Sequence, residues 1–337
     1  MLNNGVHYVQ QDHALPIEGL TAASTAGPDW GLSFTYDGFG NRTNQSVTKG
    51  SGPTVSLSIN PANNRINSSG YTYDSNGNLT ALPGSTFVYD IENRMVQVTS
   101  SGSEYYSYDP WNRRVWKTTT TDGAGNIFFY GAMGELMGTF SCAAGCTNDP
   151  PVKVETNLHF AGKLIRWNNG ATVLDRLGGV VKRSNIFASP QINQTSSYYP
   201  LGEERTTTGQ DRTKFSTYYR DNKTAFDYAM NRYYNSSWGR FTTPDPYGPS
   251  ANPASPLSWN RYAYVANDPI NQNDPSGLIM LSPLYFADKS MGEGWLEWVL
   301  KGSPQVGQHY YITDVIQENH DQYSGAKLVE NALGSSK

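Results

Sequence analysis

The sequence is poor in charge and has no long apolar segment. Only 16% of its 337 residues are charged, and the net charge of -4 gives no basic stripe for a nucleic-acid partner. The longest apolar run, at 278–287, is about half as long as a membrane-spanning helix and contains Pro283. Residues 1–30 lack the basic start and apolar centre of a signal peptide, and Met1 could be the cut end of a longer chain. The sequence therefore indicates neither a nucleic-acid partner nor a membrane partner.

Cysteine is scarce, since the chain has only Cys142 and Cys146. The two could be a redox or metal pair, a small loop disulfide in an exported protein, or two idle thiols. Two ligands cannot close a zinc site, and the five histidines are scattered along the chain. The sequence therefore predicts no metal site and no cofactor, and it favours the loop disulfide or the idle thiols.

Tyrosine, glycine and proline are abundant, with 23, 33 and 19 residues. Aromatic and β-branched residues favour strands, whereas glycine, asparagine and proline favour turns. A chain of this length buries roughly three quarters of its unfolded surface and forms one to three domains. The composition predicts a mainly β protein.

A short motif recurs along the first half of the chain, at 34–45, 71–82, 87–98 and 106–117, with a decayed version at 128–139. Each copy alternates aromatic residues, then has Tyr-Asp, a turn with asparagine or glycine, and a second alternating run. This pattern predicts a β-hairpin whose aspartate caps the turn by accepting backbone N–H groups. Because such units stack laterally, we expect sequentially paired hairpins in one continuous curved sheet.

These segments resemble the YD, or Rhs, repeats of bacterial polymorphic toxins, of the C subunits of insecticidal toxin complexes, and of teneurins. Later segments at 174–180, 198–206, 218–246 and 258–278 are similar to the end of the repeats and the Rhs repeat-associated core. In that family the repeats form a β-sheet wound into a hollow shell. About five repeats are too few to close a shell, so the chain resembles the C-terminal end of a larger one.

The resemblance implies four parts. Residues 1–140 would be YD-repeat hairpins, 141–206 the last repeats and the connection to the core, 207–278 the core, and 279–337 a variable tail. Three positions depart from the family pattern: Ala225-Phe226 replaces Gly-Leu, Asn235 replaces Asp, and Gly179 replaces Ser.

Two aspartates, Asp221 and Asp245, are candidates for catalysis. Asp245 lies between two prolines, which would hold it rigidly, but spacing alone favours structural turns over a catalytic pair. Members of the family with this core act as aspartic self-proteases that cut after the Leu of Asp-Pro-x-Gly-Leu. The resemblance therefore implies that Asp221 and Asp245 share a proton and activate a water, and that Arg220 orients Asp221.

The implied cut lies between Leu278 and Ile279. Gly277 would let the backbone enter a narrow site, and Leu278 would fill an apolar pocket. The other family positions have structural interpretations. Asp268 and Asp274 would cap turns, with Asp274 as a third acid near the cut that we leave outside the pair. The remaining arginines and aromatics would be structural or core residues: Arg232, Arg240, Arg261, Trp238, Phe241, Trp259 and Tyr262.

The tail beyond Leu278 has a different composition. Apolar spacings at 294–302 and 325–333 predict short amphipathic helices. The acidic and histidine residues at 309–321 have no recognisable ligand spacing, so a polar helix face is favoured over a metal-dependent nuclease fragment. The family resemblance implies that this tail is an effector remnant.

Two functions follow from the sequence. The first is the C-terminal part of a secreted or cell-surface bacterial Rhs-type toxin whose core cuts after Leu278. Its partners would be its own C-terminal segment, an upstream YD-repeat shell, an immunity protein and secretion machinery. The alternative is a non-cleaving YD-repeat surface protein for adhesion or carbohydrate binding.

Overall fold

The computed structural model describes residues 7–9, 29–119, 124–132, 134–143, 151–160, 162–251 and 256–281. This part of the chain is mainly β and contains no α-helix, and its helical turns are short 3-10 helices. Within it, no helix has the length and apolar character needed to span a membrane. The helices expected at 294–302 and 325–333 lie outside the described residues.

The first Tyr-Asp hairpin lies in a separate four-stranded antiparallel sheet. The segment between this sheet and the next repeat is rich in asparagine and serine and contains Pro61, and these residues favour turns over a long ladder. The predicted continuous sheet is therefore wrong at this point. The strands of the sheet are β1 (His7–Val9), β2 (Gly31–Tyr36), β3 (Arg42–Lys49) and β4 (Val55–Ser56), and a two-stranded sheet of β5 (Ile59–Asn60) and β6 (Arg65–Ile66) follows.

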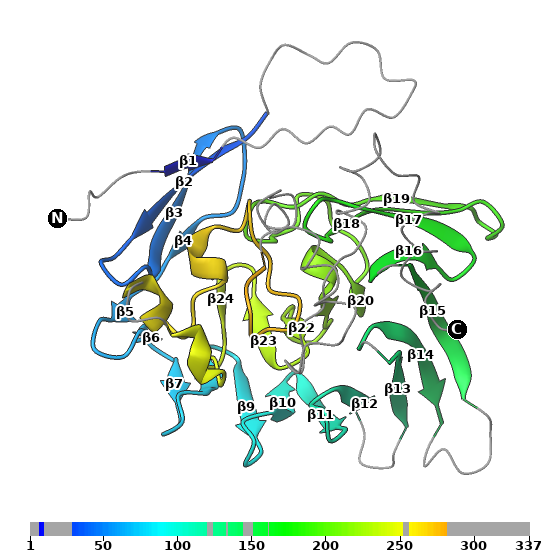
Figure 1. Cartoon of the computed structure of the whole chain (residues 1–337), viewed down its shortest axis with the longest axis horizontal. Coiled ribbons are helices and arrows are strands. Elements are labelled where there is room, and N and C mark those ends of the chain that lie inside the picture. The colour runs from blue at the N-terminus through cyan, green and yellow to red at the C-terminus, as the bar shows by residue number, and fades with distance from the viewer. Residues whose placement is uncertain are drawn as a thin grey trace, which may run out of the picture.

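The later repeats form a thirteen-stranded antiparallel sheet in which the strands pair in chain order, from β7 to β19. The sequential pairing of hairpins is thereby confirmed. Figure 1 shows the strands following one another along a curved wall. They are β7 (Thr72–Tyr73), β8 (Leu79–Leu82), β9 (Ser85–Tyr89), β10 (Met95–Ser100), β11 (Gly102–Tyr108), β12 (Arg114–Thr118), β13 (Gly125–Tyr130), β14 (Leu136–Cys142), β15 (Val152–Phe160), β16 (Lys163–Trp167), β17 (Gly170–Leu174), β18 (Val180–Asn185) and β19 (Ile192–Thr195).

The aspartate of each Tyr-Asp pair closes the turn of its hairpin, as expected. Asp90 Oδ1 accepts the N–H groups of Glu92 and Arg94 at 3.0 and 2.9 Å, and its Oδ2 accepts Arg94 Nε at 2.7 Å. Asn93 has a φ of 61°, in the left-handed region that asparagine tolerates better than most residues. Equivalent backbone bonds to the carboxylate close the turns at Asp37, Asp74, Asp109 and Asp175.

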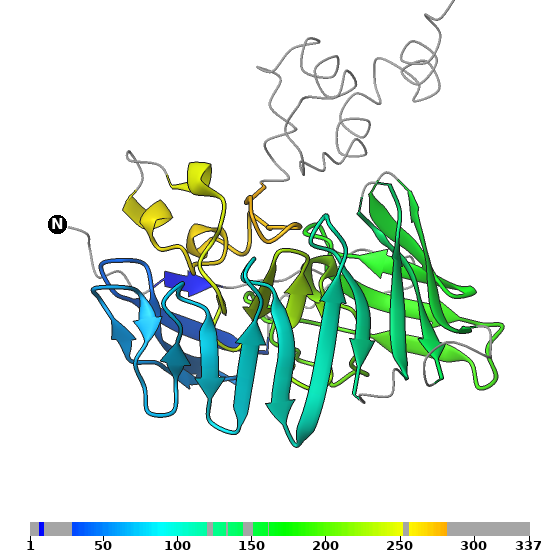
Figure 2. The same cartoon turned by 90° about the horizontal axis from the view of Figure 1, so that it is seen from below.

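The predicted core, residues 207–278, lies inside the curve of the wall (Figures 1 and 2). It is a five-stranded antiparallel sheet with four short 3-10 helices around it. Aromatic contacts join it to the wall, for example Phe128 to Tyr219 at 5.2 Å and Phe87 to Phe226 at 5.5 Å between ring centroids. The elements are β20 (Arg212–Thr213), η2 (Phe215–Thr217), β21 (Tyr219–Arg220), β22 (Asp227–Ala229), β23 (Arg232–Asn235), β24 (Arg240–Phe241), η3 (Gly248–Ser250), η4 (Pro256–Trp259) and η5 (Val265–Asn267).

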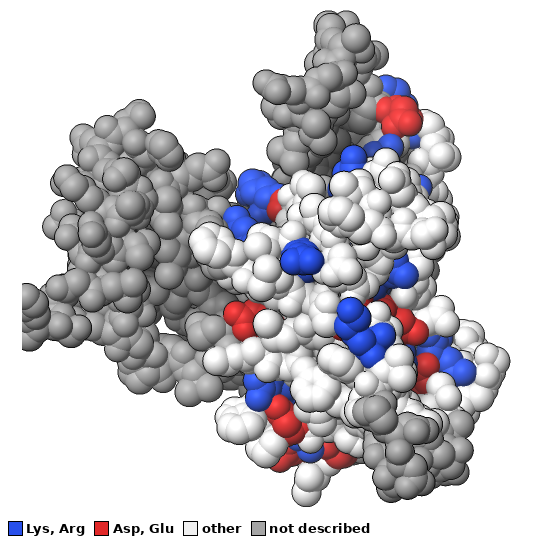
Figure 3. Space-filling model, turned by 90° about the vertical axis from the view of Figure 1, so that its right-hand side faces the viewer, with Lys and Arg blue, Asp and Glu red and all other residues white. Residues whose placement is uncertain are grey.

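The surface agrees with the low charge of the sequence. Figure 3, which views the side of the wall that carries β15 to β19, shows scattered charges of both signs among mostly uncharged residues. Cys142, at the end of β14, is disulfide-bonded, which agrees with the loop disulfide and not with idle thiols.

Candidate functional site

Asp221 is held by cations of the repeat wall. Its side chain is fully buried, and Arg114 of β12 binds it with both terminal nitrogens, at 2.6 Å to Oδ2 and 3.0 Å to Oδ1. Lys117 Nζ lies 3.1 Å from Oδ1. Burial alone would raise the pKa of Asp221, but Arg114 and Lys117 hold it below its ordinary value. The carboxylate is therefore kept ionised by partners on a neighbouring sheet.

The structure does not bring the predicted pair together. Asp245 accepts the N–H of Tyr247 at 2.8 Å and the hydroxyl of Ser250 at 2.7 Å. Among the described residues, Asp221 and Asp245 share no hydrogen-bond or ion-pair partner, since Asp221 binds Arg114 and Lys117 of the wall. The predicted pairing of Asp221 with Asp245 is therefore not what the geometry supports.

Arg220 does not orient Asp221 either. Its guanidinium binds the carboxylate of Asp227, with Nε 2.8 Å from Oδ1 and Nη2 2.6 Å from Oδ2. Arg220 ends strand β21 and Asp221 follows it directly, and side chains of successive extended residues leave the backbone on opposite sides. The side chains of Arg220 and Asp221 therefore point in opposite directions, although the two residues are adjacent in the sequence.

The predicted cleavage segment folds into a tight turn around Asp274. Asp274 Oδ1 accepts the N–H groups of both Leu278 and Ile279, each at 3.0 Å. Asn273 and Leu281 form a β-bridge that closes the turn. The nitrogen of the Leu278–Ile279 peptide bond thus lies directly against a carboxyl group.

Arg232, at the start of β23, connects this turn to Asp245. Its Nη2 lies 3.0 Å from Asp274 Oδ2 and 3.7 Å from Asp245 Oδ2. Its Nε donates to the carbonyl oxygen of Gly277, and the guanidinium lies 3.5 Å from the centroid of the Phe241 ring. Arg232 therefore lies between the carboxyl groups of Asp245 and Asp274, and Asp274 contacts the predicted scissile segment.

The surroundings of Asp274 raise its pKa above the ordinary value. Burial is the largest cause of this rise, and the nearby Asp245 carboxylate adds to it, while Arg232 and the backbone N–H groups of Ile279 and Leu278 lower the pKa of Asp274. Two close carboxyl groups of which one is protonated can serve as an acid and a base. Among the described residues, no group of three or more His, Cys, Asp or Glu could hold a metal ion.

A cavity of about 270 Å³ lies beside Asp245. The turns of two repeats and the Asp245 loop line it, with Asn76, Asn93 and Asn231 among the lining residues. Asn231 Nδ2 also donates to the carbonyl oxygen of Ser276 at 3.0 Å, next to the cleavage turn. Because a water occupies about 30 Å³, the cavity is large enough and polar enough for several.

Sequence reasoning missed two residues of this site. Asp274 lies outside the predicted pair, although it precedes Leu278 by four residues, the spacing at which Asp90 accepts the N–H of Arg94 in the repeats. That spacing predicts the contact of Asp274 with the predicted scissile segment. Arg232 gave no local signal, because its partner Asp274 is 42 residues away.

The fold and the site together define a class of protein, a wall of Tyr-Asp hairpins curved around a small core that holds two carboxyl groups at a tight turn. The chain is 30% identical to the tRNA3(Ser)-specific nuclease WapA of Bacillus spizizenii over 73% of its length. It is 28% identical to the tRNA nuclease WapA of Bacillus subtilis, also over 73%, and 24% identical to the toxin protein Tse5 of Pseudomonas aeruginosa over 64%. It spans 11% of each WapA protein and 19% of Tse5.

Solved structures show the same fold. A TcdB2–TccC3 crystal structure matches 74% of this chain with a TM-score of 0.55 and 19% identity, and the match covers 14% of that chain. The Tc holotoxin pore of Photorhabdus luminescens matches 74% of this chain and 13% of its own, with a TM-score of 0.53 and 18% identity. No family model matches the chain. On the strength of these relatives, the chain belongs to the Rhs/YD-repeat family.

Proposed function

We propose that the chain is the C-terminal part of an Rhs-type toxin shell and that its core cuts the chain after Leu278. The observation that carries this proposal is the turn at Asp274. One carboxyl group touches the nitrogen of the Leu278–Ile279 bond, and a second, Asp245, meets it at Arg232. The four-part division of the chain belongs to this proposal, with residues 279–337 as the released segment.

In this mechanism Asp245 and Asp274 have different roles. Asp245 takes a proton from a water, and the water oxygen bonds to the carbonyl carbon of Leu278. Asp274, protonated, gives its proton to the nitrogen of Ile279 as the C–N bond breaks. The products are a carboxyl group on Leu278 and a free amine on Ile279. Asp221 has no role in the chemistry.

The substrate is already held in place. Arg232 binds the Gly277 carbonyl, and Asn231 binds that of Ser276, so two successive carbonyl groups before the cut are fixed. Because the segment belongs to the same chain, the reaction needs no intermolecular affinity, and positioning supplies much of the rate.

The proposal also sets the partners and the setting. The core would act on its own C-terminal segment inside a wall continued by upstream repeats, in a secreted or cell-surface bacterial toxin. An immunity protein and secretion machinery would be further partners. The names of the relatives, tRNA nuclease for WapA and toxin for Tse5, support a toxin.

Expression of the chain followed by mass spectrometry tests the proposal. We expect a new N-terminus at Ile279 in the wild type, and an intact chain in Asp245→Asn and in Asp274→Asn. Asp268→Asn, an aspartate in a turn outside the site, is the matched control and should be cut normally. An intact wild-type chain, or cutting that persists in both variants, would contradict the proposal. The intact wild type would favour the non-cleaving adhesion or carbohydrate-binding protein.

A further inference from the structure

Arg114 is a residue of the repeat wall whose polar contacts reach into the core. Its side chain has no solvent exposure and forms the two bonds to Asp221 described above. Its Nη1 also lies 3.1 Å from the hydroxyl of Tyr233, and its backbone N–H donates to the hydroxyl of Tyr228 at 2.7 Å. Three residues of the core are thus fixed to one residue of the wall.

Aromatic rings from both sides enclose the Arg114 guanidinium. Its central carbon lies between 4.6 and 5.9 Å from five ring centroids. A guanidinium over aromatic faces is attracted by their quadrupoles, more strongly when it is desolvated. The wall contributes two rings and the core three, which are Tyr106, Phe128, Tyr219, Tyr228 and Tyr233.

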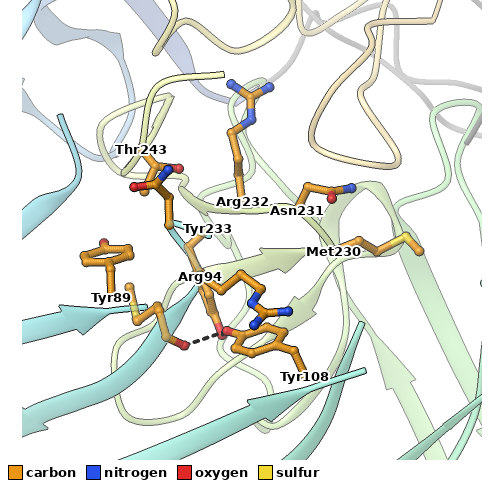
Figure 4. A pocket seen from close by; sticks show the side chains of 10 residues that line it. Tyr89, Arg94, Tyr108, Met230, Asn231, Arg232, Tyr233 and Thr243 are labelled. Carbon is orange, nitrogen blue, oxygen red and sulfur yellow. Dashed lines mark hydrogen bonds between the residues drawn. The ribbon is translucent and has the colours of Figure 1, made fainter. Parts of the chain in front are cut away.

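Strand β23 connects the contacts with Arg114 to the cleavage turn. Tyr233 and Arg232 are neighbours in β23, so their side chains leave the strand on opposite faces, as Figure 4 shows. Tyr233 reaches the wall, where its hydroxyl lies 3.1 Å from that of Tyr108. Arg232 reaches Asp274 and the Gly277 carbonyl on the other face. Because the two residues are adjacent in β23, the contact of Tyr233 with the wall fixes the position of the Arg232 guanidinium.

We propose that Arg114 is a positioning residue for self-cleavage, which seats β21 to β23 on the repeat wall and so places Arg232 at the cleavage turn. The inference rests on the proposed function. Its consequence is that the core cuts only when it is docked on the wall, so that the C-terminal segment is released from the chain after the wall around it has formed.

A pair of tyrosine variants tests the proposal. Tyr233→Phe removes a hydroxyl that joins the core to Arg114, whereas Tyr130→Phe removes a hydroxyl that bonds the Arg114 carbonyl at 2.9 Å from within the wall. Each loses one partly or fully buried hydroxyl at the same arginine. We expect Tyr233→Phe to slow cleavage roughly tenfold or more, and Tyr130→Phe to leave the rate unchanged. Arg114→Lys keeps the charge but loses the two-pronged contact, and it should also slow cleavage.

A pH profile separates positioning from loss of stability. The groups that face Asp274 are Arg232, Asp245, Tyr218 and Tyr264. Arg232 lowers the pKa of Asp274, so a displaced Arg232 lets that pKa rise and moves the alkaline limb of the cleavage profile to higher pH. A variant that is only less stable would yield less folded protein with the wild-type profile. Precursors recovered from inclusion bodies in urea would be refolded across about pH 4 to 8 and followed on denaturing gels.

The outcomes are distinguishable. Slower cleavage with a shifted profile in Tyr233→Phe, and a normal Tyr130→Phe, supports the proposal. Wild-type rates and profiles in both Tyr233→Phe and Arg114→Lys overturn it, as does a loss that only follows the folded fraction. A wild-type chain that is not cut after Leu278 would instead contradict the proposed function.

Discussion

Replacing Asp221 with asparagine tests whether this residue holds the fold together or takes part in catalysis. The carboxylate is fully buried and forms ion pairs with two cations, Arg114 and Lys117, at 2.6 to 3.1 Å. Removing one partner of such a buried pair costs about 3–5 kcal/mol, because the remaining charge is left uncompensated. Asp221→Asn should therefore lower the free energy of unfolding by about that amount, a large share of the roughly 5–15 kcal/mol of a typical domain.

The sign of the pH dependence follows from the lowered pKa of Asp221. A depressed pKa stabilises the folded state above the unfolded-state value of about 3.9, and this stability is lost as pH falls through the folded-state value. The difference in the free energy of unfolding between the wild type and Asp221→Asn should therefore be largest at neutral pH and should decrease on acidification.

Urea unfolding in an Asp274→Asn background, in which the proposed cleavage is blocked, measures the effect. Asp268→Asn in the same background is the control and should change stability by about 0.5 kcal/mol or less. An unchanged unfolding midpoint for Asp221→Asn, with cleavage abolished when Asp274 is intact, would refute the reasoning and restore Asp221 as a catalytic acid.

Three further predictions concern the cleavage turn and the repeats. Gly277→Ala should block cleavage, because Gly277 has a φ of 71° and a Cβ there would lie 2.5 Å from the Ala229 carbonyl oxygen; a denaturing gel checks this. Cleavage should slow as pH rises through the raised pKa of Asp274, because its proton is then lost, and refolding at graded pH with a time course measures it. Asn93→Val should lower the free energy of unfolding by about 1–3 kcal/mol, since φ is 61° there, whereas Asn93→Gly should cost less; urea unfolding compares the two.

The local structure could be predicted from the sequence. Each Tyr-Asp turn is closed by bonds between residues two and four positions apart, as at Asp90, so a short motif contains all the partners. The hairpins and their order along the sheet were predictable for the same reason. The turn at the cleavage segment is equally local, since Asp274 bonds Leu278 and Ile279.

The partners of the buried acids, in contrast, could not be predicted from local sequence. Arg114 and Asp221 are 107 residues apart, and Arg232 and Asp274 are 42 apart. No local pattern fixes such pairs, because they depend on how the core sits against the wall. Asp221 and Arg220 are neighbours in the sequence, but side chains alternate along an extended chain, so the two point to opposite sides. Asp221 therefore binds Arg114 of the wall instead of Arg220. Asp245 and Asp274 lie near each other because one buried guanidinium, that of Arg232, attracts both carboxyl groups.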